Sequence, residues 1–420
     1  MKFALACYGM RGDIEPSVVA GRELLRRGHD VRIAVPPNLV GFAEAAGLKA
    51  FPYGLDSRPL VDKQREYWTC FFRSPWKGKE LERLGRQIAN FVTRCWTLEA
   101  TTTTLTSLAD GADLLIAGLG FEQFPANVAE YFDIPMATLH FVPLRANGQV
   151  LRFLPTPVAR SAMTGYERLS WSGAVKDVEA AQRRELGLPK ATRPWPSRIA
   201  ARGSLEIQAY EEVCFPGLAA EWAKWGDKRP FVGTLALQQA TDADAEVTSW
   251  IAGGTPPIFF SFGSIPISSA ADMLSMIADV CAQLGERALI SSGGSDFSDV
   301  THFRHVKVVS VVNYATIFPL CRAVVHHGGA GTVAAGLRAG VPQVILWTFF
   351  DQPIFGSAIK RLKVGAAQRF STSTRESLIV ILRRVLTPQF RTRAREVATQ
   401  VSDATESASV TADLLEKFAR

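Results

Sequence analysis

The chain has 420 residues, 47% of them hydrophobic and 21% charged, and Lys and Arg outnumber Asp and Glu by 47 − 40 = 7. This length exceeds one ordinary hydrophobic core and predicts two domains. The mild positive charge suits anionic small molecules or an anionic membrane surface. Nucleic-acid binding is not supported, since no dense stripe of basic residues interleaves with aromatic ones. No apolar run approaches the roughly eighteen residues of a membrane span, and the first run, broken at Arg11, is too short for a secretory signal.

The cysteines show no C-x-x-C spacing, and most of them lie in apolar segments. We therefore expect reduced, buried thiols in a cytosolic protein. The six are Cys7, Cys70, Cys95, Cys214, Cys281 and Cys321.

In the first half of the chain, short apolar runs alternate with segments of helical periodicity. Residues 3–8 form the first predicted strand, a helix extends from Pro16 to a glycine stop at Gly28, and residues 31–35 form the next strand. This alternation predicts a parallel sheet with helices on both faces. The same half contains predicted helices at 39–46 and 122–132 and predicted strands at 113–117 and 135–140.

The second half repeats the pattern after a break. Residues 233–245 lose hydrophobic periodicity and are predicted to be a linker between domains 1–232 and 246–400. A D-x-D motif at Asp242 to Asp244 has no strand before it, so we interpret it as part of a solvated linker. The elements predicted beyond it are strands at 258–262, 287–291, 306–311 and 323–325 and helices at 270–284 and 407–418.

Residues 324–332, V-V-H-H-G-G-A-G-T, lead from an apolar strand through two histidines into a glycine loop and an Ala-rich helix. Unpaired amides and the dipole at a helix N-terminus favour negative charge. The glycines let a diphosphate approach the main chain, and the histidines can donate to the same oxygens. The pattern predicts a phosphate site.

Three other segments carry polar groups at the carboxyl ends of predicted strands, where open α/β sheets bind ligands. Asp13 precedes the first helix, so it is either a site residue or a cap paired with Arg11. The segment 260–264, F-S-F-G-S, is either a second wall of a nucleotide site or an ordinary turn. Asp351 and Gln352 either bind sugar hydroxyls or cap a helix.

Several nucleotide motifs are missing from the chain. It has neither the G-x-x-x-x-G-K-[ST] of a P-loop ATPase nor a G-x-G-x-x-G after the first strand, as in an NAD or FAD enzyme. We expect neither a metal ion nor a bound cofactor. An aromatic cluster from Tyr67 to Trp76 is interpreted as core packing, with an acceptor wall or a membrane-facing lip as the alternative.

Three motifs in this order, G-x-R-G-D-x-x-P, H-H-G-G-A-G-T and D-Q-P, resemble the family 1 glycosyltransferases of the GT-B fold. The resemblance is to the branch of sterol glycosyltransferases and antibiotic-glycosylating bacterial enzymes, and residues 11–37 are most similar to mycobacterial glycopeptidolipid glycosyltransferases. It implies an α/β protein whose two Rossmann-like parallel-sheet domains face each other across a cleft. Residues 1–232 would bind the acceptor and 246–400 the nucleotide-sugar, with a terminal helix in 401–420 returning to the first domain.

The resemblance also assigns roles to residues. It implies that Asp13 is the catalytic base. The aromatic cluster supplies the acceptor candidates Trp68, Phe71, Phe72 and Trp76. The donor's phosphates would be bound by Arg11, Gly12, Ser264, His326, His327, Gly328, Gly329, Gly331 and Thr332, its sugar by Asp351 and Gln352, and its base by Val312 and Asn313.

One departure from the family concerns the nucleotide. Plant members carry a ribose-binding glutamate where this chain has Ala335, and they have a Trp over the base that this chain lacks. Both differences favour a dTDP-sugar over a UDP-sugar. The resemblance thus predicts a metal-independent, inverting transfer of a (6-deoxy)hexose from a dTDP- or UDP-sugar to a bulky hydrophobic acceptor.

The acceptor expected from the resemblance and the aromatic cluster is a glycopeptidolipid-type lipopeptide of the cell envelope. The enzyme would be cytoplasmic or peripheral on the inner face of the plasma membrane. Two alternatives stay open: a sugar-nucleotide epimerase of the same fold, and a non-catalytic, membrane-associated protein that binds nucleotide-sugars.

Overall fold

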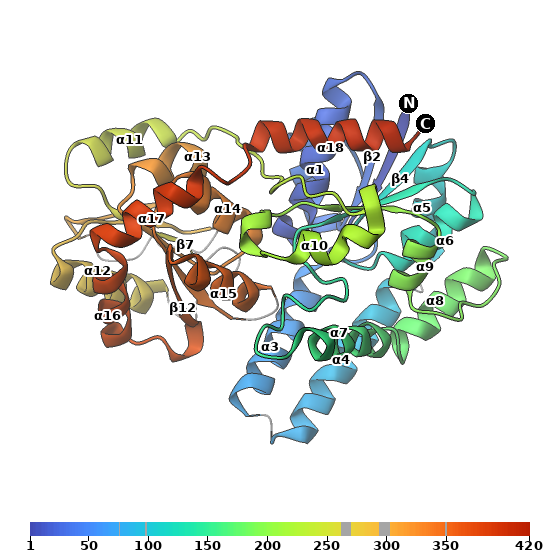
Figure 1. Ribbon diagram of the computed structural model, residues 1–420, viewed down its shortest axis with the longest axis horizontal. Helices are drawn as coiled ribbons and strands as arrows, with labels where there is room; N and C mark the ends of the chain where they lie inside the picture. Colours follow the sequence, from blue (N-terminus) through green and yellow to red (C-terminus); the bar gives the residue numbers. More distant parts are fainter. Residues whose placement is uncertain (75, 97–98, 262–269, 294–302, 349–350) are drawn as a thin grey trace. The chain divides into compact units, whose positions relative to one another are not determined.

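The computed structural model describes residues 1–74, 76–96, 99–261, 270–293, 303–348 and 351–420 (Figure 1). The chain forms two compact units, which we call unit 1 (Met1–Ala236 with Ser402–Arg420) and unit 2 (Leu237–Val401). Each unit is built around one parallel sheet, as the alternation of strands and helices predicts.

The sheet of unit 1 has six strands in the order β3-β2-β1-β4-β5-β6. Strands β1, β4 and β5 are apolar and almost fully buried, as expected for strands covered by helices on both faces. The strand order reverses between β1 and β4, so their carboxyl ends flank the point where open α/β sheets bind ligands. The strands are β1 Lys2–Ala6, β2 Asp30–Val35, β3 Lys49–Pro52, β4 Leu114–Gly118, β5 Met136–His140 and β6 Leu205–Gln208.

The helices of unit 1 include a long hairpin, α3 and α4, that extends from the sheet (Figure 1). Predictions from the sequence gave no element between residues 58 and 109, where aromatic residues and threonines weaken the helical pattern. The helices are α1 Arg11–Arg26, α2 Val40–Ala45, α3 Arg58–Arg73, α4 Gly78–Trp96, α5 Glu99–Ala109, α6 Gln123–Tyr131, α7 Thr156–Ser170, α8 Ala174–Glu185, α9 Trp195–Ala201, α10 Leu218–Trp222 and α18 Ala404–Phe418, with 3-10 turns η1 Pro37–Leu39, η2 Glu212–Cys214 and η3 Ala223–Lys228.

The sheet of unit 2 also has six parallel strands, in the order β12-β11-β10-β7-β8-β9. Its order reverses between β7 and β10, where Ser261 pairs with His326 in register. The elements are β7 Ile258–Ser261, β8 Ala288–Ser291, β9 Val306–Val309, β10 Ala323–His326, β11 Gln343–Trp347, β12 Gly365–Arg369, α11 Asp244–Ala252, α12 Ala270–Leu284, α13 Tyr314–Ile317, α14 Ala330–Arg338, α15 Gln352–Leu362, α16 Arg375–Val385, α17 Pro388–Ala398, η4 Phe318–Leu320 and η5 Phe370–Thr372.

The segment between the units is more ordered than its composition suggests. Leu235 is buried, and the Thr234 N–H donates to Glu211 Oε1 (2.9 Å). At the other end, Asp244 is buried in the first turn of α11, and its Oδ1 accepts from the backbone N–H of Asn313 (2.9 Å). The interpretation of Asp244 as a solvated linker residue is therefore wrong, because its carboxylate pairs with main-chain amides.

The C-terminal helix α18 packs on α1 within unit 1. Arg27 anchors it through Asp413 (2.6 Å) and Glu416 (3.3 Å), and His29 Nε2 lies 2.8 Å from Glu416. All six cysteines are free and only Cys70 is not buried. Among the described residues, no helix is long and apolar enough to cross a membrane.

Candidate active site

Asp13 lies at the third position of α1, just after the carboxyl end of β1. Its Oδ2 accepts from the backbone N–H of Met10 (2.7 Å), which fixes the side chain against the turn that enters the helix. Its Oδ1 accepts no hydrogen bond from the part of the chain that the structure describes. The same carboxylate therefore has one oxygen that positions it and a second that is available to a ligand.

The surroundings of Asp13 change its acidity. Burial raises the pKa of this carboxyl to about 6, and the bond from Met10 offsets only part of that effect. Gly9 makes room for the side chain, since a Cβ at Gly9 would lie 2.6 Å from the Cβ of Asp13. A perturbed carboxyl group at the strand-order reversal of a sheet is a candidate for acid–base chemistry.

Arg11 and Gly12 precede Asp13 and are both exposed. The Arg11 guanidinium lies over the ring of Phe42 at 4.7 Å and 3.8 Å from Glu15. Gly12 has open space where a side chain would be. A phosphate-binding role stays a prediction for both residues.

The two adjacent histidines of unit 2 have different environments. His326 is the last residue of β10 and is fully buried. Its Nδ1 accepts from the Gly328 N–H (3.1 Å), so its Nε2 carries the hydrogen and donates to Gln343 Oε1 (2.9 Å). No ring N–H is left for a phosphate, so we keep His326 as the residue that shapes the loop and retain only His327 as a candidate ligand.

His327 starts the loop that leads into α14. Its Nδ1 is buried without a hydrogen-bond partner among the described residues. Desolvation lowers the pKa of His327 to about 4, so the ring is neutral at physiological pH. Gly329 leaves space for the ring, because a Cβ there would lie 2.6 Å from His327 Nε2. A neutral imidazole in this position can donate one hydrogen bond to an anion without itself carrying charge.

The loop ends at the N-terminus of α14, where first-turn amides have no acceptor within the helix. Gly331 has no neighbouring atom within 4 Å of where a Cβ would lie, so this turn has room for a ligand. Gly328 has φ +95°, which favours glycine, and its Cβ position would be 3.4 Å from Gln352 Cβ. The structure therefore brings the glycine loop and the D-Q-P motif together, and Thr332 is buried in the first turn.

Asp351 and Gln352 lie at the start of α15, immediately beyond β11. Gln352 is buried, and its Oε1 accepts from the Thr348 N–H (2.7 Å). Asp351 occupies the N-cap position without forming a side-chain cap. Gln352 thus shapes the loop after β11, while both residues stay sugar-binding candidates.

The base-binding candidates lie beside β9 and α13. Val312 is buried, and the Asn313 N–H is used by Asp244. Asn313 Oδ1 caps α13 by accepting from the Ala315 N–H (3.1 Å). Any contact of Asn313 with a base would therefore have to use its carbonyl or its side-chain amide. Ser264, the candidate from the other loop, lies outside the described residues.

Two aromatic residues that were not predicted as site residues, Tyr314 and Trp347, lie near the carboxyl ends of strands in unit 2. The Tyr314 hydroxyl lies 3.3 Å from Ser261 Oγ at the carboxyl end of β7, and its ring stacks on Phe318. Trp347 ends β11, and the guanidinium of Arg369 lies 5.2 Å from its ring. Tyr314 follows an apolar run and Trp347 ends one. An aromatic residue at the carboxyl end of a predicted strand could therefore have been noted from the sequence, because open α/β sheets bind ligands at that edge.

The acceptor candidates lie along α3 of unit 1. Trp68 and Phe71 contact each other edge to face with ring centroids 5.6 Å apart. Trp76 lies beyond the end of α3 and is 78% exposed. The Phe72 side chain lies outside the described parts of the chain.

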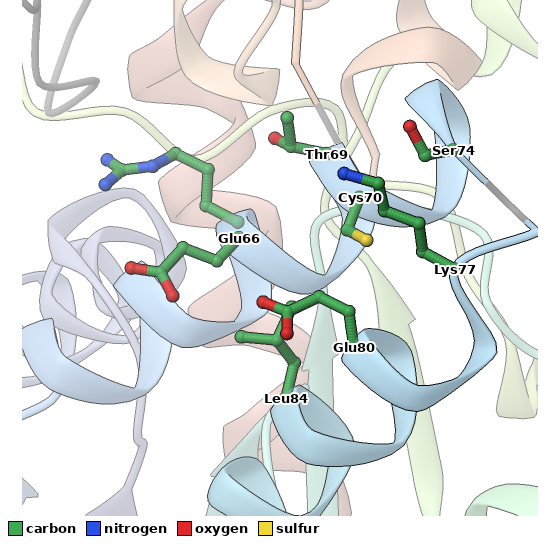
Figure 2. Close-up of a pocket in the computed structure, with 8 residues that line it drawn as sticks. Glu66, Thr69, Cys70, Ser74, Lys77, Glu80 and Leu84 are labelled. Carbon is green, nitrogen blue, oxygen red and sulfur yellow. The ribbon is translucent and has the colours of Figure 1, made fainter.

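A pocket of about 930 Å³ lies between α3 and α4 (Figure 2). In Figure 2, the Lys77 ammonium lies on the side of Thr69 and Cys70, and the carboxylates of Glu66 and Glu80 point away from it. Leu84 supplies an apolar floor. The predicted acceptor aromatics are not among the residues that line it, so this pocket is polar and separate from them.

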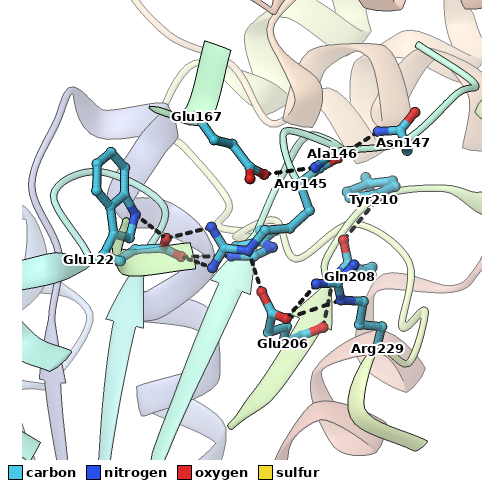
Figure 3. Close-up of polar contacts among 11 residues, drawn as sticks. Glu122, Arg145, Ala146, Asn147, Glu167, Glu206, Gln208, Tyr210 and Arg229 are labelled. Carbon is cyan, nitrogen blue, oxygen red and sulfur yellow. Dashed lines mark hydrogen bonds and ion pairs between the residues drawn. The ribbon is translucent and has the colours of Figure 1, made fainter. Parts of the chain in front are cut away.

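A buried ion network supports the segment after β5 (Figure 3). Arg145 bridges Glu122 (2.9 Å) and Glu206, and Arg229 also contacts Glu206 (2.9 Å). Burial alone would raise the pKa of Glu122, but Arg145 and His140 hold it below its usual range. The network joins the carboxyl ends of β4 and β5 to β6 and so fixes the shape of this edge of the sheet.

The chain is similar to known glycosyltransferases. Residues 277–417 match the family described as Erythromycin biosynthesis protein CIII-like, C-terminal domain. The chain is 55% identical over 423 residues to an uncharacterized glycosyltransferase of Mycobacterium tuberculosis, covering 100% of this chain and 99% of the relative. It is also 27% identical over 380 residues to a sterol 3-beta-glucosyltransferase of Arabidopsis thaliana, covering 87% of this chain and 57% of that protein.

Solved structures share the fold of the whole chain. The glycosyltransferase of kitacinnamycin has a TM-score of 0.71 and 16% identity, covering 100% of this chain and 99% of that one. The glycosyltransferase VinC, solved in complex with dTDP, has a TM-score of 0.64 and 18% identity, covering 99% and 100%.

Two units with six-stranded parallel sheets and flanking helices define the two-domain α/β architecture of GT-B glycosyltransferases. With the 55% identical relative, the chain belongs to the family 1 glycosyltransferases of this fold and is a transferase. The family, the fold class and the class of enzyme predicted from the motifs are confirmed.

Proposed function

We propose that this glycosyltransferase moves a hexose or 6-deoxyhexose from a dTDP- or UDP-sugar to a hydroxyl of a bulky hydrophobic acceptor, with inversion at the anomeric carbon. The observation that carries the proposal is Asp13, whose pKa is raised to about 6 and whose Oδ1 is available at the carboxyl edge of β1. A carboxyl group with this pKa is ionised at neutral pH and accepts a proton more readily than an ordinary aspartate.

In the proposed step, the acceptor oxygen forms a bond to the anomeric carbon while its proton passes to Asp13 Oδ1. The bond from the anomeric carbon to the diphosphate oxygen breaks, and the nucleoside diphosphate leaves with that electron pair. Attack opposite the leaving group inverts the anomeric configuration. Such general-base assistance contributes roughly a hundredfold or more to the rate.

The leaving diphosphate would be stabilised by unit 2. The first-turn amides of α14, the open space at Gly331 and a neutral donor at His327 together suit an oxyanion. Asp351 and Gln352 would then meet the sugar, since Gln352 lies beside Gly328. This route stabilises the leaving group without a metal ion and needs no cofactor.

The nature of the donor and acceptor is inferred from neighbours and from the chain's own residues. VinC, which shares the fold, was solved with dTDP, and a small Ala335 in α14 provides no side-chain acceptor for a ribose hydroxyl. A relative acts on sterols, and aromatic residues line α3. We therefore propose a dTDP-sugar donor and a lipid-bearing acceptor of the glycopeptidolipid type, reached by peripheral contact with the inner membrane surface.

Replacing Asp13 with Asn tests the proposal directly. Asn keeps the shape but cannot take the proton, so kcat should fall by about two orders of magnitude or more, while dTDP affinity stays unchanged. Transfer to a cell-envelope lipid extract would be followed by mass spectrometry with a panel of dTDP- and UDP-sugars, and product anomers by NMR. Near-normal turnover by a folded D13N enzyme would remove Asp13 as the base. Conversion of the donor without any acceptor would instead identify an epimerase.

A further inference from the structure

The outward face of α7 carries an apolar stripe that no other part of the described chain covers. Of the thirteen exposed large apolar side chains in the described residues, four lie between positions 153 and 169. Phe153 is 82% and Leu169 71% exposed, with Val158 and Tyr166 between them. One side of α7 carries side chains at the helical spacing of three to four residues, namely Val158, Ala162, Tyr166 and Leu169. We call these side chains, with Phe153, the α7 face.

The charges around the α7 face are positive. Glu167 is the one acidic residue of α7, and its carboxylate is used by the Ala146 N–H (2.8 Å). Arg168 is exposed and forms no ion pair with the described part of the chain, whereas Arg160 pairs with Glu221 (2.8 Å). An apolar stripe flanked by arginine is the pattern of a helix that lies in a membrane interface.

The tip of the α3–α4 hairpin, by which we mean Trp76, Lys77 and Lys79, also combines an exposed apolar side chain with positive charge. Trp76 is 78% exposed and is followed by Lys77 and Lys79, both exposed and without an ion pair among the described residues. The first acid of α4, Glu80, pairs with Arg83 (2.5 Å). Figure 1 shows α7 and the hairpin at the same end of unit 1, opposite the end that carries both chain termini.

We propose that the α7 face and the hairpin tip dock unit 1 on an anionic lipid bilayer. The apolar side chains would enter the interface, where Trp and Tyr are favoured, and the unpaired lysines and arginine would meet anionic headgroups. This inference rests on the proposed function, because a lipid-bearing acceptor would be presented at that surface. Docking would let unit 1 reach the acceptor's hydroxyl while its acyl part stays in the bilayer.

Co-sedimentation of the full chain with vesicles tests the surface without any acceptor. Vesicles of phosphatidylcholine with about 30% phosphatidylglycerol, an anionic lipid, should bind the wild type. The double change Phe153→Ser with Leu169→Ser should weaken binding roughly tenfold or more, because two apolar side chains no longer leave water. Val380→Ser with Val410→Ser, also exposed but on α16 and α18, is the matched control and should bind as the wild type does.

A second variant tests whether the exposed lysines of the hairpin tip bind anionic headgroups. Lys77→Ala with Lys79→Ala should weaken binding to the anionic vesicles by about fivefold for each lysine and leave binding to pure phosphatidylcholine unchanged. The control Lys190→Ala with Lys360→Ala removes the same net charge from exposed positions elsewhere and should have a smaller effect. Thermal unfolding midpoints equal to that of the wild type would show that all four variants fold.

Three results would overturn the proposal. The wild type could fail to bind anionic vesicles, or the Phe153/Leu169 variant could bind them as tightly as its control. The third result comes from light scattering without lipid. If the wild type were an oligomer and the Phe153/Leu169 variant a monomer, the α7 face would bind a second copy of the chain. Asp13→Asn should still bind vesicles, so a loss of transfer and a loss of docking are measured separately.

Discussion

Gly9 and Asp13 are sterically coupled, because a Cβ at Gly9 would lie 2.6 Å from the Cβ of Asp13. Gly9 also has φ +151°, a backbone conformation that other residues rarely adopt. The glycine in the connection between β1 and α1 therefore makes room for the carboxylate in the first turn of the helix. The family motif around Asp13 depends on this space as well as on the carboxylate itself.

Replacing Gly9 with Ala should displace Asp13 and reduce kcat by about tenfold or more, since a small misplacement of a catalytic group is costly. The measurement is steady-state transfer together with the thermal unfolding midpoint. Gly41→Ala is the control, because no atom lies within 4 Å of its Cβ position. If G9A were fully active, Asp13 would not be held by this contact.

The raised pKa of Asp13, about 6, predicts an acid limb in the pH profile of kcat/KM. Activity should fall about tenfold per pH unit below that value as the base is protonated. D13N should lack this limb in its residual activity. A flat wild-type profile between pH 5 and 7 would contradict the assignment.

The same pKa predicts that Asp13 costs stability. A carboxyl whose folded pKa is raised binds its proton more tightly when folded, so stability decreases as pH rises from about 3.8 to about 6. The full shift corresponds to at most about 3 kcal/mol, and because Asp13 is only half-buried we expect about 1 kcal/mol. Urea unfolding at pH 7 should therefore find D13N more stable than the wild type, with a smaller difference at pH 4.

The adjacent histidines predict opposite phenotypes. His326→Ala removes a buried ring and leaves its two hydrogen-bond partners, Gln343 Oε1 and the Gly328 N–H, unpaired, which should lower stability by about 2–4 kcal/mol. His327→Ala should leave stability nearly unchanged but weaken dTDP binding and slow transfer, because only a ligand contact is lost. Calorimetric titration with dTDP and chemical denaturation of both variants would compare them. Equal dTDP binding by H327A and the wild type would refute its role.

The buried network around Arg145 predicts a large effect on stability. Arg145→Met would leave Glu122 and Glu206 without their shared cation, at a cost of about 3–5 kcal/mol. Arg202→Met is the control, since it removes an exposed pair with Asp133 and should cost less than about 1 kcal/mol. Unfolding midpoints that fall equally in both variants would show that the network contributes no more than a surface pair.

The sequence by itself determined the sheet type, the paired α/β organisation and the family. Parallel strands buried on both faces must be nearly continuous apolar runs, and glycine loops at strand ends are local signals, so both can be seen without the fold. The helices between residues 58 and 109 could not be predicted, because aromatic residues and threonines blur the helical period and the helices form by burying side chains such as Leu84 and Trp96.

Only the tertiary structure decided which members of each motif face a ligand. The sequence alone does not distinguish the two adjacent histidines. In the fold, strand pairing buries His326 against Gln343, whereas the Nδ1 of His327 has no partner among the described residues. The sequence predicted a solvated Asp244, because hydrophobic periodicity carries no information about distant hydrogen-bond partners. The backbone amide that Asp244 binds belongs to Asn313, which lies sixty-nine positions away in the chain. Hydrogen bonds between distant segments form only when the chain folds, and they set both the availability of each group and its pKa.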